Sequence, residues 1–227
     1  MRWIFAISLI AIICGACGSP EATQTTSEPS QAEPVSPPPS QDSRKKVLFF
    51  GNSLTAGYGV DLSQAFPSLI QGYMDSLDLD YQVINAGISG ETTTGGLNRL
   101  SWALKQEIAV FVLELGANDG MRGIPAEATK QNLQGMIDLV LDTYPDCKIL
   151  FTGMMVPPNM GDDYLQEFQQ IFPNVAAANR EKVSFLPFLL EGVAGEPELN
   201  QADGIHPTPE GHEIVAKHVW QALEPML

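Results

Sequence analysis

Residues 47–59 have the sequence VLFFGNSLTAGYG, in which four consecutive apolar residues run directly into a glycine-rich turn. A short, uninterrupted apolar run of this kind is typical of a strand that is buried on both faces of a parallel sheet. The turn that follows would carry Ser53 to the rim of that sheet, where a side chain can meet a ligand. Ser53 is therefore the first candidate for a nucleophile.

A complementary pattern occurs near the other end of the chain, where residues 203–207 have the sequence DGIHP. A loop with Asp203 at i and His206 at i+3 can fold so that the carboxylate accepts a hydrogen bond from one imidazole nitrogen. The other imidazole nitrogen would then be free to take a proton from Ser53. Together, the two segments predict a Ser-His-Asp triad whose members occur in the order Ser53, Asp203, His206.

The sequence between these two ends alternates between strand-like and helix-like patterns. Apolar runs predict strands at 47–50, 81–86, 108–113, 149–152 and 183–186. Apolar residues spaced three and four apart predict helices at 66–77, 97–104, 133–144, 165–172 with a bend at Pro173, and 209–223. Five strands separated by helices imply a parallel sheet with helices on both faces, which is a three-layer α/β/α sandwich of the flavodoxin-like type.

Small and polar loops follow the ends of these predicted strands. Besides the turn at Ser53, they contain Gly90, Asn118 and the segment 157–161. Because ligands of parallel α/β sheets bind beyond the carboxyl ends of the strands, these loops are predicted to surround one site. The Met and Pro residues of the last loop offer an apolar, adaptable wall. The candidate substrate-binding residues there are Pro157, Asn159 and Met160.

The first 45 residues do not resemble part of a packed domain. Met1 and Arg2 precede an apolar run at 3–13 and the sequence CGAC at 14–17, which is the order of a secretory signal. The run is shorter than the roughly 20 residues that a membrane-spanning helix needs. Residues 1–17 resemble the signal of a bacterial lipoprotein, in which Cys17 would become the lipid-modified N-terminus. Plain secretion is the alternative.

Residues 18–45 are predicted to be a disordered tether, because residues 18–43 consist almost wholly of Ser, Pro, Thr, Gln, Glu and Ala. Residues 46–227 are long enough for one domain with a sizeable core. This domain has nine Lys and Arg against 23 Asp and Glu, a net charge of −14. Such an acidic surface argues against nucleic acid and anionic lipids as partners, so attachment to a membrane would depend on the lipid on Cys17.

The sequence predicts no metal site and no cofactor. His212 and His218 are six positions apart on the last predicted helix, about 240° around it, so they cannot form a metal-binding pair on one face. No G-x-G-x-x-G pattern opens the first helix, which disfavours a dinucleotide site. A flavin phosphate could be held by the first loop of a flavodoxin-like sheet, but that hypothesis gives the 203–207 pattern no role. Cys147 precedes an apolar run and is predicted to be a packing residue.

Four short blocks resemble the SGNH, or GDSL, hydrolases, and in particular their thioesterase, arylesterase and lysophospholipase branch. In order, these blocks are GNSL at 51–54, SGET at 89–92, GAND at 116–119 and DGIHP at 203–207. GNSL alone is a weak signal, since a serine in a glycine-rich turn is usually structural, but four blocks in order are far more specific. The resemblance extends over residues 46–227 and implies the SGNH hydrolase fold.

The resemblance also implies a role for each block. Ser53 would be the nucleophile, His206 the general base and then acid, and Asp203 the group that orients the imidazole. The oxyanion hole would combine the backbone N–H groups of Ser53 and Gly90 with the side-chain amide of Asn118. A neutral amide suits that position because it donates without being neutralised as the anion forms.

The chain departs from the family pattern beside the nucleophile, where the family usually has Asp and this sequence has Asn52. An Asn can make many of the same turn hydrogen bonds, so the change removes one charge and bears on local geometry and pH optimum. The neighbouring acids Glu91 and Asp119 are predicted to be turn or helix-cap residues rather than participants in the chemistry.

These patterns predict a serine esterase that hydrolyses carboxylic esters through an acyl-enzyme on Ser53. Short to medium acyl esters or aryl esters are the expected substrates, and the resemblance extends the range to thioesters and lysophospholipids. Two alternatives stay open: an O-acetylesterase that acts on envelope polysaccharide, and a non-catalytic binding lipoprotein. No protein partner is implied, and the expected location is the cell envelope.

Overall fold

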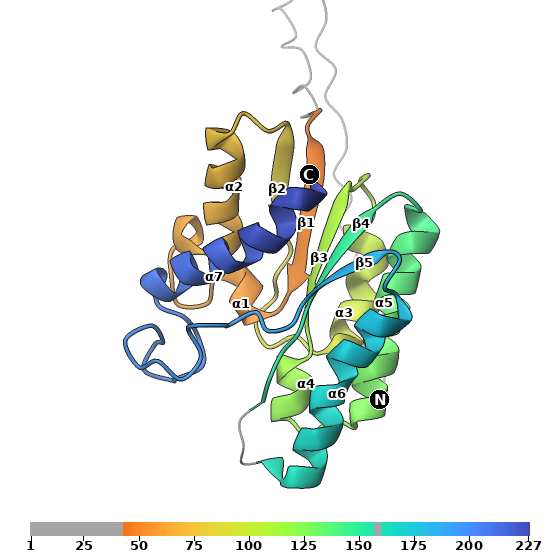
Figure 1. Cartoon of the computed structure of the whole chain (residues 1–227), viewed down its shortest axis with the longest axis vertical. Coiled ribbons are helices and arrows are strands. Elements are labelled where there is room, and N and C mark those ends of the chain that lie inside the picture. The colour runs from red at the N-terminus through yellow and green to blue at the C-terminus, as the bar shows by residue number, and fades with distance from the viewer. Residues whose placement is uncertain (1–42, 157–159) are drawn as a thin grey trace, which may run out of the picture. The chain divides into compact units, whose positions relative to one another are not determined.

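The computed structural model of the chain describes residues 43–156 and 160–227 (Figure 1). The predicted export signal with Cys17, the predicted tether up to residue 42, and the candidate residues Pro157 and Asn159 lie outside the described residues. Among the residues that are described, no helix combines the length and the apolar character needed to cross a membrane.

The described part of the chain contains a sheet of five strands. They are β1 (Lys45–Gly51), β2 (Tyr81–Asn85), β3 (Val110–Glu114), β4 (Lys148–Thr152) and β5 (Val183–Leu186). The strands lie in the order β2-β1-β3-β4-β5, and every neighbouring pair is parallel. The predicted five-stranded parallel sheet is therefore confirmed. The strand order changes direction between β1 and β3, which is where parallel α/β sheets open a crevice for ligands.

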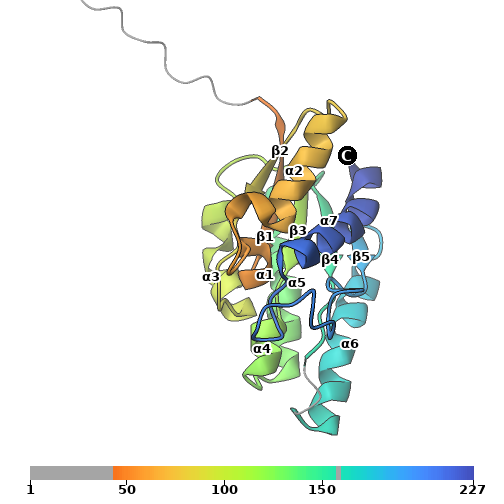
Figure 2. The same cartoon turned by 90° about the vertical axis from the view of Figure 1, so that its left-hand side faces the viewer.

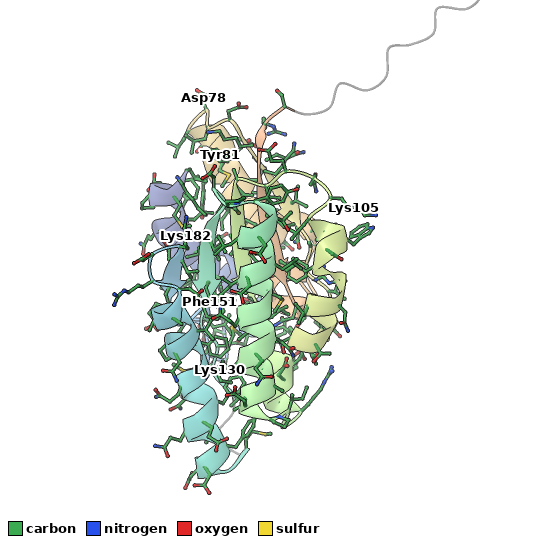
Figure 3. All side chains as sticks on the ribbon, turned by 90° about the vertical axis from the view of Figure 1, so that its right-hand side faces the viewer. Asp78, Tyr81, Lys105, Lys130, Phe151 and Lys182 are labelled. Atoms are coloured by element: carbon green, nitrogen blue, oxygen red, sulfur yellow. The ribbon has the colours of Figure 1, made fainter. Side chains whose placement is uncertain are left out.

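Helices cover both faces of the sheet. One face carries α2 (Phe66–Ser76) and α7 (Pro209–Leu223), as Figure 2 shows. The opposite face carries α3 (Thr93–Ala103), α5 (Ala126–Thr143) and α6 (Asp162–Ala178), as Figure 3 shows. The short helices α1 (Ser53–Ala56) and α4 (Ala117–Met121) follow β1 and β3 closely, and single turns of 3-10 helix occupy Leu62–Gln64 and Glu224–Met226. This is the predicted α/β/α sandwich.

The hydrophobic core lies on both sides of the sheet, as the uninterrupted apolar strands predicted. Residues 47–50 of β1 are at most 1% exposed. Phe49 packs edge-on against Phe66 of α2, and Phe151 of β4 stacks near Phe172 of α6, each pair with ring centroids 5.7 Å apart. Full burial of each such ring stabilises the fold by about 2–3 kcal/mol. The strand ends that carry the polar loops are therefore anchored in a close-packed core.

One boundary differs from the prediction in a way that concerns the site. β3 ends at Glu114, which the sequence pattern placed in the following loop. Apolar residues indicate where a strand is buried, but a strand ends where its pairing ends, and Glu114 still pairs with Gly51 of β1. The predicted packing role of Cys147 is confirmed, since this residue is 5% exposed in the core.

Candidate active site

Ser53 lies where β1 passes into the four-residue helix α1. Asn52 caps that helix, because its side-chain Oδ1 accepts from the backbone N–H of Leu54 at 2.9 Å. Gly57 ends the helix in the left-handed conformation, with a φ of 75° that suits glycine far better than other residues. These local features hold Ser53 at the first position of α1, at the carboxyl edge of the sheet, where it is 9% exposed.

His206 lies between two oxygen atoms from distant parts of the sequence. Its Nε2 is 2.8 Å from Oγ of Ser53, and its Nδ1 is 2.6 Å from Oδ2 of Asp203. Both distances are within the range for proton transfer along a hydrogen bond. The structure thus brings the three residues of the predicted triad into one hydrogen-bonded line.

The two carboxylate oxygens of Asp203 have different partners. Oδ1 accepts from the backbone N–H groups of Ile205 at 2.9 Å and His206 at 3.0 Å, which folds the loop, and Oδ2 faces the imidazole. Hydrogen bonds from the His206 side chain and backbone lower the pKa of Asp203 to about 2. Because the carboxylate is charged at neutral pH, it selects the imidazole tautomer with a proton on Nδ1, which leaves Nε2 to accept from Ser53.

The three predicted oxyanion donors follow three neighbouring strands. Ser53 follows β1, Gly90 lies in the loop after β2, and Asn118 lies on α4 after β3. Gly90 has a φ of 79°, which permits the turn that exposes its backbone N–H. Within the described residues, neither the Ser53 nor the Gly90 N–H donates to another backbone group. Both are therefore available to a bound oxygen atom.

Hydrogen bonds connect these loops to one another. The N–H of Ile88 donates to the carbonyl of Gly51 at 3.0 Å, which ties the Gly90 loop to the nucleophile strand. Nδ2 of Asn118 donates to the carbonyl of Glu91 at 3.0 Å, which ties α4 to the same loop and leaves a second N–H of that amide. The relative positions of the three donors are thus fixed by hydrogen bonds within the protein.

Of the candidate substrate-binding residues, only Met160 is among the described ones. It is half-buried at the start of the segment that leads into α6. Its Cε lies 3.8 Å from the position that a Cβ on Gly123 would occupy, so the side chain lies beside the loop that follows α4. The structure therefore places Met160 near the end of the helix that carries Asn118.

Of the two acids that were predicted to be turn or helix-cap residues, Asp119 caps a helix and Glu91 forms an ion pair. The carboxylate of Asp119 accepts from the N–H of Thr93 at 2.8 Å and from its hydroxyl at 2.5 Å, so it satisfies the first N–H group of α3. Glu91 forms an ion pair with Arg99, in which Nε donates to Oε1 at 2.7 Å. Both acids therefore hold the loop that carries Gly90 rather than facing Ser53.

Three residues of the site were not predicted from the sequence. Glu114 is buried beneath the turn of Ser53 and accepts four hydrogen bonds from it. The ring of Tyr58 lies against that of His206, with centroids 4.6 Å apart. Gln201 donates from its side chain to the carbonyl of Tyr58 at 2.7 Å and from its backbone to the carbonyl of His206 at 2.7 Å. Apart from the bond between Gln201 and His206 within one loop, these contacts join residues that are far apart in sequence, so no local pattern could indicate them.

The two remaining histidines lie away from the triad line. His218 has its Nε2 3.0 Å from the carbonyl of Phe188 and is partly buried. His212 is 1% exposed, and its Nδ1 accepts from the backbone N–H of Phe66 at 3.3 Å. In residues 43–156 and 160–227, no cluster of three or more His, Cys, Asp and Glu side chains has the arrangement of a metal site.

A serine, a histidine and a carboxylate in one hydrogen-bonded line, beside free N–H donors at the carboxyl edge of a parallel sheet, define a serine hydrolase. The chain belongs to the GDSL-like lipase/acylhydrolase family, whose sequence profile matches residues 49–214. The protein is an esterase of this family.

Relatives with assigned names include an arylesterase and a thioesterase. The chain is 40% identical over 180 residues to an arylesterase of Vibrio mimicus, a match that covers 79% of this chain and 88% of the relative. It is 36% identical over 182 residues to thioesterase 1/protease 1/lysophospholipase L1 of Escherichia coli K12, covering 80% and 84% of the two chains. The crystal structure of TesA is similar with a TM-score of 0.75 at 40% identity, covering 81% of this chain and 100% of that one.

Proposed function

We propose that the protein cleaves carboxylic esters through an acyl-enzyme formed on Ser53. Nε2 of His206 takes the Ser53 proton as Oγ bonds to the ester carbonyl carbon, and it returns that proton to the alcohol oxygen as the C–O bond breaks. Water then attacks the acyl carbon and gives a proton to His206, and the Ser53 oxygen leaves with it, which releases the carboxylic acid. The hydrogen-bonded line of Ser53, His206 and Asp203 is the observation that carries this proposal.

Three N–H donors are assigned to the oxyanion that forms in each half of the reaction. They are the backbone N–H groups of Ser53 and Gly90 and the second N–H of the Asn118 amide. The bond from Asn118 to the Glu91 carbonyl holds the amide plane in place before substrate arrives. Donors that are already oriented stabilise developing charge without a cost for reorganisation.

Exposed apolar side chains favour an acyl or aryl group as the bound part of the substrate. Tyr58, Ile88, Met155 and Ile205 are 40–56% exposed, and each belongs to a loop at the carboxyl end of the sheet. Apolar walls with a few oriented polar groups are the usual lining of a small-molecule site. Short to medium acyl esters and aryl esters are therefore the proposed substrates. Thioesters and lysophospholipids present the same acyl carbonyl and are included.

The experiment that tests this function is hydrolysis of p-nitrophenyl esters, from acetate to palmitate, by the purified protein. The Ser53→Ala variant is expected to lose activity by several orders of magnitude, because the acyl-enzyme cannot form. Ser101→Ala, which alters an exposed serine of α3, is the matched control and is expected to retain wild-type turnover. A folded Ser53→Ala variant with wild-type turnover would contradict the assignment of the nucleophile.

The dependence on acyl-chain length separates the proposed function from its alternatives. We expect the highest kcat/KM between butyrate and octanoate. A preference for acetate that disappears beyond two carbons would favour the O-acetylesterase, which release of acetate from acetylated polysaccharide would then test. A folded wild-type protein without activity on any ester would favour the non-catalytic binding lipoprotein.

We further propose that a lipid on Cys17 holds the protein at the cell envelope. The support is the sequence of an export signal, a cysteine and a Pro- and Ser-rich tether. Growth with labelled palmitate is expected to label the wild type and a Cys147→Ala control, but not Cys17→Ser. An unlabelled wild-type protein in the culture medium would indicate plain secretion instead.

A further inference from the structure

A buried carboxylate lies directly beneath the turn that carries Ser53. Glu114 is the last residue of β3, it pairs in register with Gly51 of β1, and it is 1% exposed. The triad and the oxyanion donors make no use of it. A buried acid without an evident role beside a nucleophile requires an explanation, because burial of a carboxylate is costly unless its partners compensate.

The partners of Glu114 are the residues on either side of Ser53. Oε2 accepts from the backbone N–H of Asn52 at 3.1 Å, from the N–H of Thr55 at 3.3 Å and from the Thr55 hydroxyl at 2.7 Å. Oε1 accepts from Nδ2 of Asn52 at 2.6 Å. Four hydrogen bonds therefore fix the backbone immediately before Ser53 and two residues after it.

The orientation of the Asn52 amide is determined by a second contact. Its Oδ1 accepts from the backbone N–H of Leu54 at 2.9 Å, and the Oγ of Ser53 lies 3.3 Å from the same oxygen. Because the Leu54 N–H can only donate, the amide cannot turn over, and its NH₂ group must face Glu114. An oxygen at the Nδ2 position would lie against a carboxylate oxygen at 2.6 Å.

Gly51 permits this arrangement. A Cβ on Gly51 would lie 2.1 Å from Oγ1 of Thr55 and 2.5 Å from Oε2 of Glu114, which is closer than a Cβ atom comes to such neighbours in real proteins. The residue that ends β1 therefore has no side chain where the carboxylate and the threonine meet. The close approach of the Glu114 carboxylate to Thr55 therefore depends on Gly51 of β1 and Glu114 of β3 as well as on the turn.

We propose that Glu114 is a positioning residue for the nucleophile, and that Asn52 is the amide partner that lets its carboxylate hold the turn of Ser53 without a shared proton. This inference depends on the proposed role of Ser53. Glu114 does not touch substrate; it acts by fixing the direction from which Ser53 meets the carbonyl carbon. Misplacement of a reacting atom by about 1 Å can cost a hundredfold in rate.

The ionisable groups around the turn do not neutralise Glu114. Its partners Asn52 and Thr55 are neutral. The ionisable groups of the triad have other partners, because His206 bonds to Ser53 and Asp203 bonds to His206. On α4, the carboxylate of Asp119 accepts a hydrogen bond from the N–H of Thr93. Burial raises the pKa of Glu114 to about 7, and the bonds from Thr55 and Asn52 act in the opposite direction. The four donors limit the rise in pKa that burial causes, because each of them stabilises the charged form.

The test exchanges donor and acceptor in the hydrogen bond between Asn52 and Glu114. In Glu114→Gln, the amide oxygen can keep the three donors of Oε2, but its NH₂ then faces the NH₂ of Asn52. In Asn52→Asp, two carboxylate oxygens face each other unless they share a proton. The double variant restores one donor and one acceptor in reversed order, because the amide of residue 114 then donates to the carboxylate of residue 52.

Two readouts are measured for each variant: kcat and KM on p-nitrophenyl butyrate, and the rate at which a fluorophosphonate labels Ser53. Each single variant is expected to lose about tenfold or more in kcat with KM changed less than about twofold, and to label more slowly. The double variant is expected to recover to within about threefold of wild type. The deficit of Asn52→Asp relative to wild type should grow between pH 6 and pH 9, as the shared proton is lost.

The matched control is Tyr144→Phe, which removes the 2.8 Å hydrogen bond to the carbonyl of Leu104 away from the active site. It is expected to lower the melting temperature while kcat stays at the wild-type value. Single variants that melt lower but keep wild-type kcat and labelling, or a double variant no better than the worse single one, would overturn the proposal. If a single variant does not fold, recovery or loss of kcat and labelling in the double variant still tests the proposal. A wild-type protein that neither hydrolyses the ester nor labels would instead overturn the proposed function.

Discussion

The imidazole of His206 depends on Asp203 for its tautomer and on the backbone for its place. The same carboxylate accepts from two backbone N–H groups of its own loop and from Nδ1 of the ring. Its depressed pKa, about 2, means that this arrangement is intact at all pH values at which the neutral imidazole could act as a base. At the scale of single residues, the proposed mechanism therefore uses Asp203 to orient the imidazole and His206 to take the Ser53 proton.

The first prediction ranks these two residues. Asp203→Asn keeps one oxygen for the loop but presents NH₂ to Nδ1, which forces the proton onto Nε2 and stops that atom from accepting. We expect kcat to fall by about 10⁴-fold in this variant and by about 10⁶-fold in His206→Ala. Steady-state kinetics of both variants at pH 8 provide the measurement. A larger loss for Asp203→Asn than for His206→Ala would contradict the roles assigned here.

The second prediction concerns the oxyanion. Asn118→Ala removes a donor that acts chiefly on the developing negative charge, so kcat should fall by about 10²- to 10³-fold with KM within about twofold. Asn132→Ala is the matched control, because Nδ2 of Asn132 donates to the hydroxyls of Thr93 and Thr94 and not to the oxyanion position. Equal losses in the two variants would show that only the loop, and not the donor, was affected.

At the scale of elements, the loop before α7 is closed on itself and tied to the turn of Ser53. Asn200 and Pro207 form an isolated antiparallel bridge, and the N–H of Thr208 donates to the carbonyl of Leu199 at 2.9 Å. The side chain of Gln201 donates to the carbonyls of Pro207 at 2.9 Å and Tyr58 at 2.7 Å. One side chain therefore links the loop of the base to the loop of the nucleophile.

The third prediction follows from that link. Gln201→Ala should lower kcat by about tenfold, because the two loops then lose their side-chain hydrogen bond and keep the triad contacts and the ring contact between Tyr58 and His206. Gln131→Ala, which alters an exposed glutamine of α5 whose side chain donates to Glu127 at 3.1 Å, is expected to have wild-type kinetics. Steady-state kinetics at several temperatures provide the measurement, and unchanged kcat in Gln201→Ala would show that the loops are fixed by other contacts.

At the scale of the whole domain, stability depends on buried ionisable groups with opposite responses to pH. His212 joins α7 to α2, and burial lowers its pKa to about 4, so its contribution is complete above its unfolded pKa of about 6.5 and is lost as pH falls through 4. Glu114, with a raised pKa of about 7, contributes most below pH 4.5 and loses that contribution as pH rises through 7.

The fourth prediction isolates the histidine. His212→Asn keeps an acceptor for the N–H of Phe66 but cannot be protonated. The difference in free energy of unfolding between wild type and this variant should therefore increase as pH rises from 4 to 6.5 and then level off. Urea denaturation at four pH values measures it, and the difference cancels the contribution of Glu114. A difference that does not change with pH would show that His212 is not buried in its neutral form.

Sequence patterns predicted the elements because burial of a strand or helix leaves a local period in the apolar residues. β5 and α7 have the predicted bounds, and the predicted triad residues meet at the carboxyl edge. Glu114 was misplaced in a loop, since the end of β3 depends on pairing with β1. The roles of Gln201 and Tyr58 were not predicted at all, because these two residues contact each other across 143 positions of the sequence.

The sequence by itself determined the order of the elements, the parallel arrangement of the sheet and the residue types that carry the chemistry. Each of these can be inferred from patterns among residues that are close together in the sequence. Only the tertiary structure decided how the strand ends are juxtaposed. The order β2-β1-β3-β4-β5 places β3 beside β1, so that Glu114 lies beneath the turn of Ser53. Hydrogen bonds and burial depend on neighbours in space, and those neighbours exist only once the crossovers have brought distant segments together.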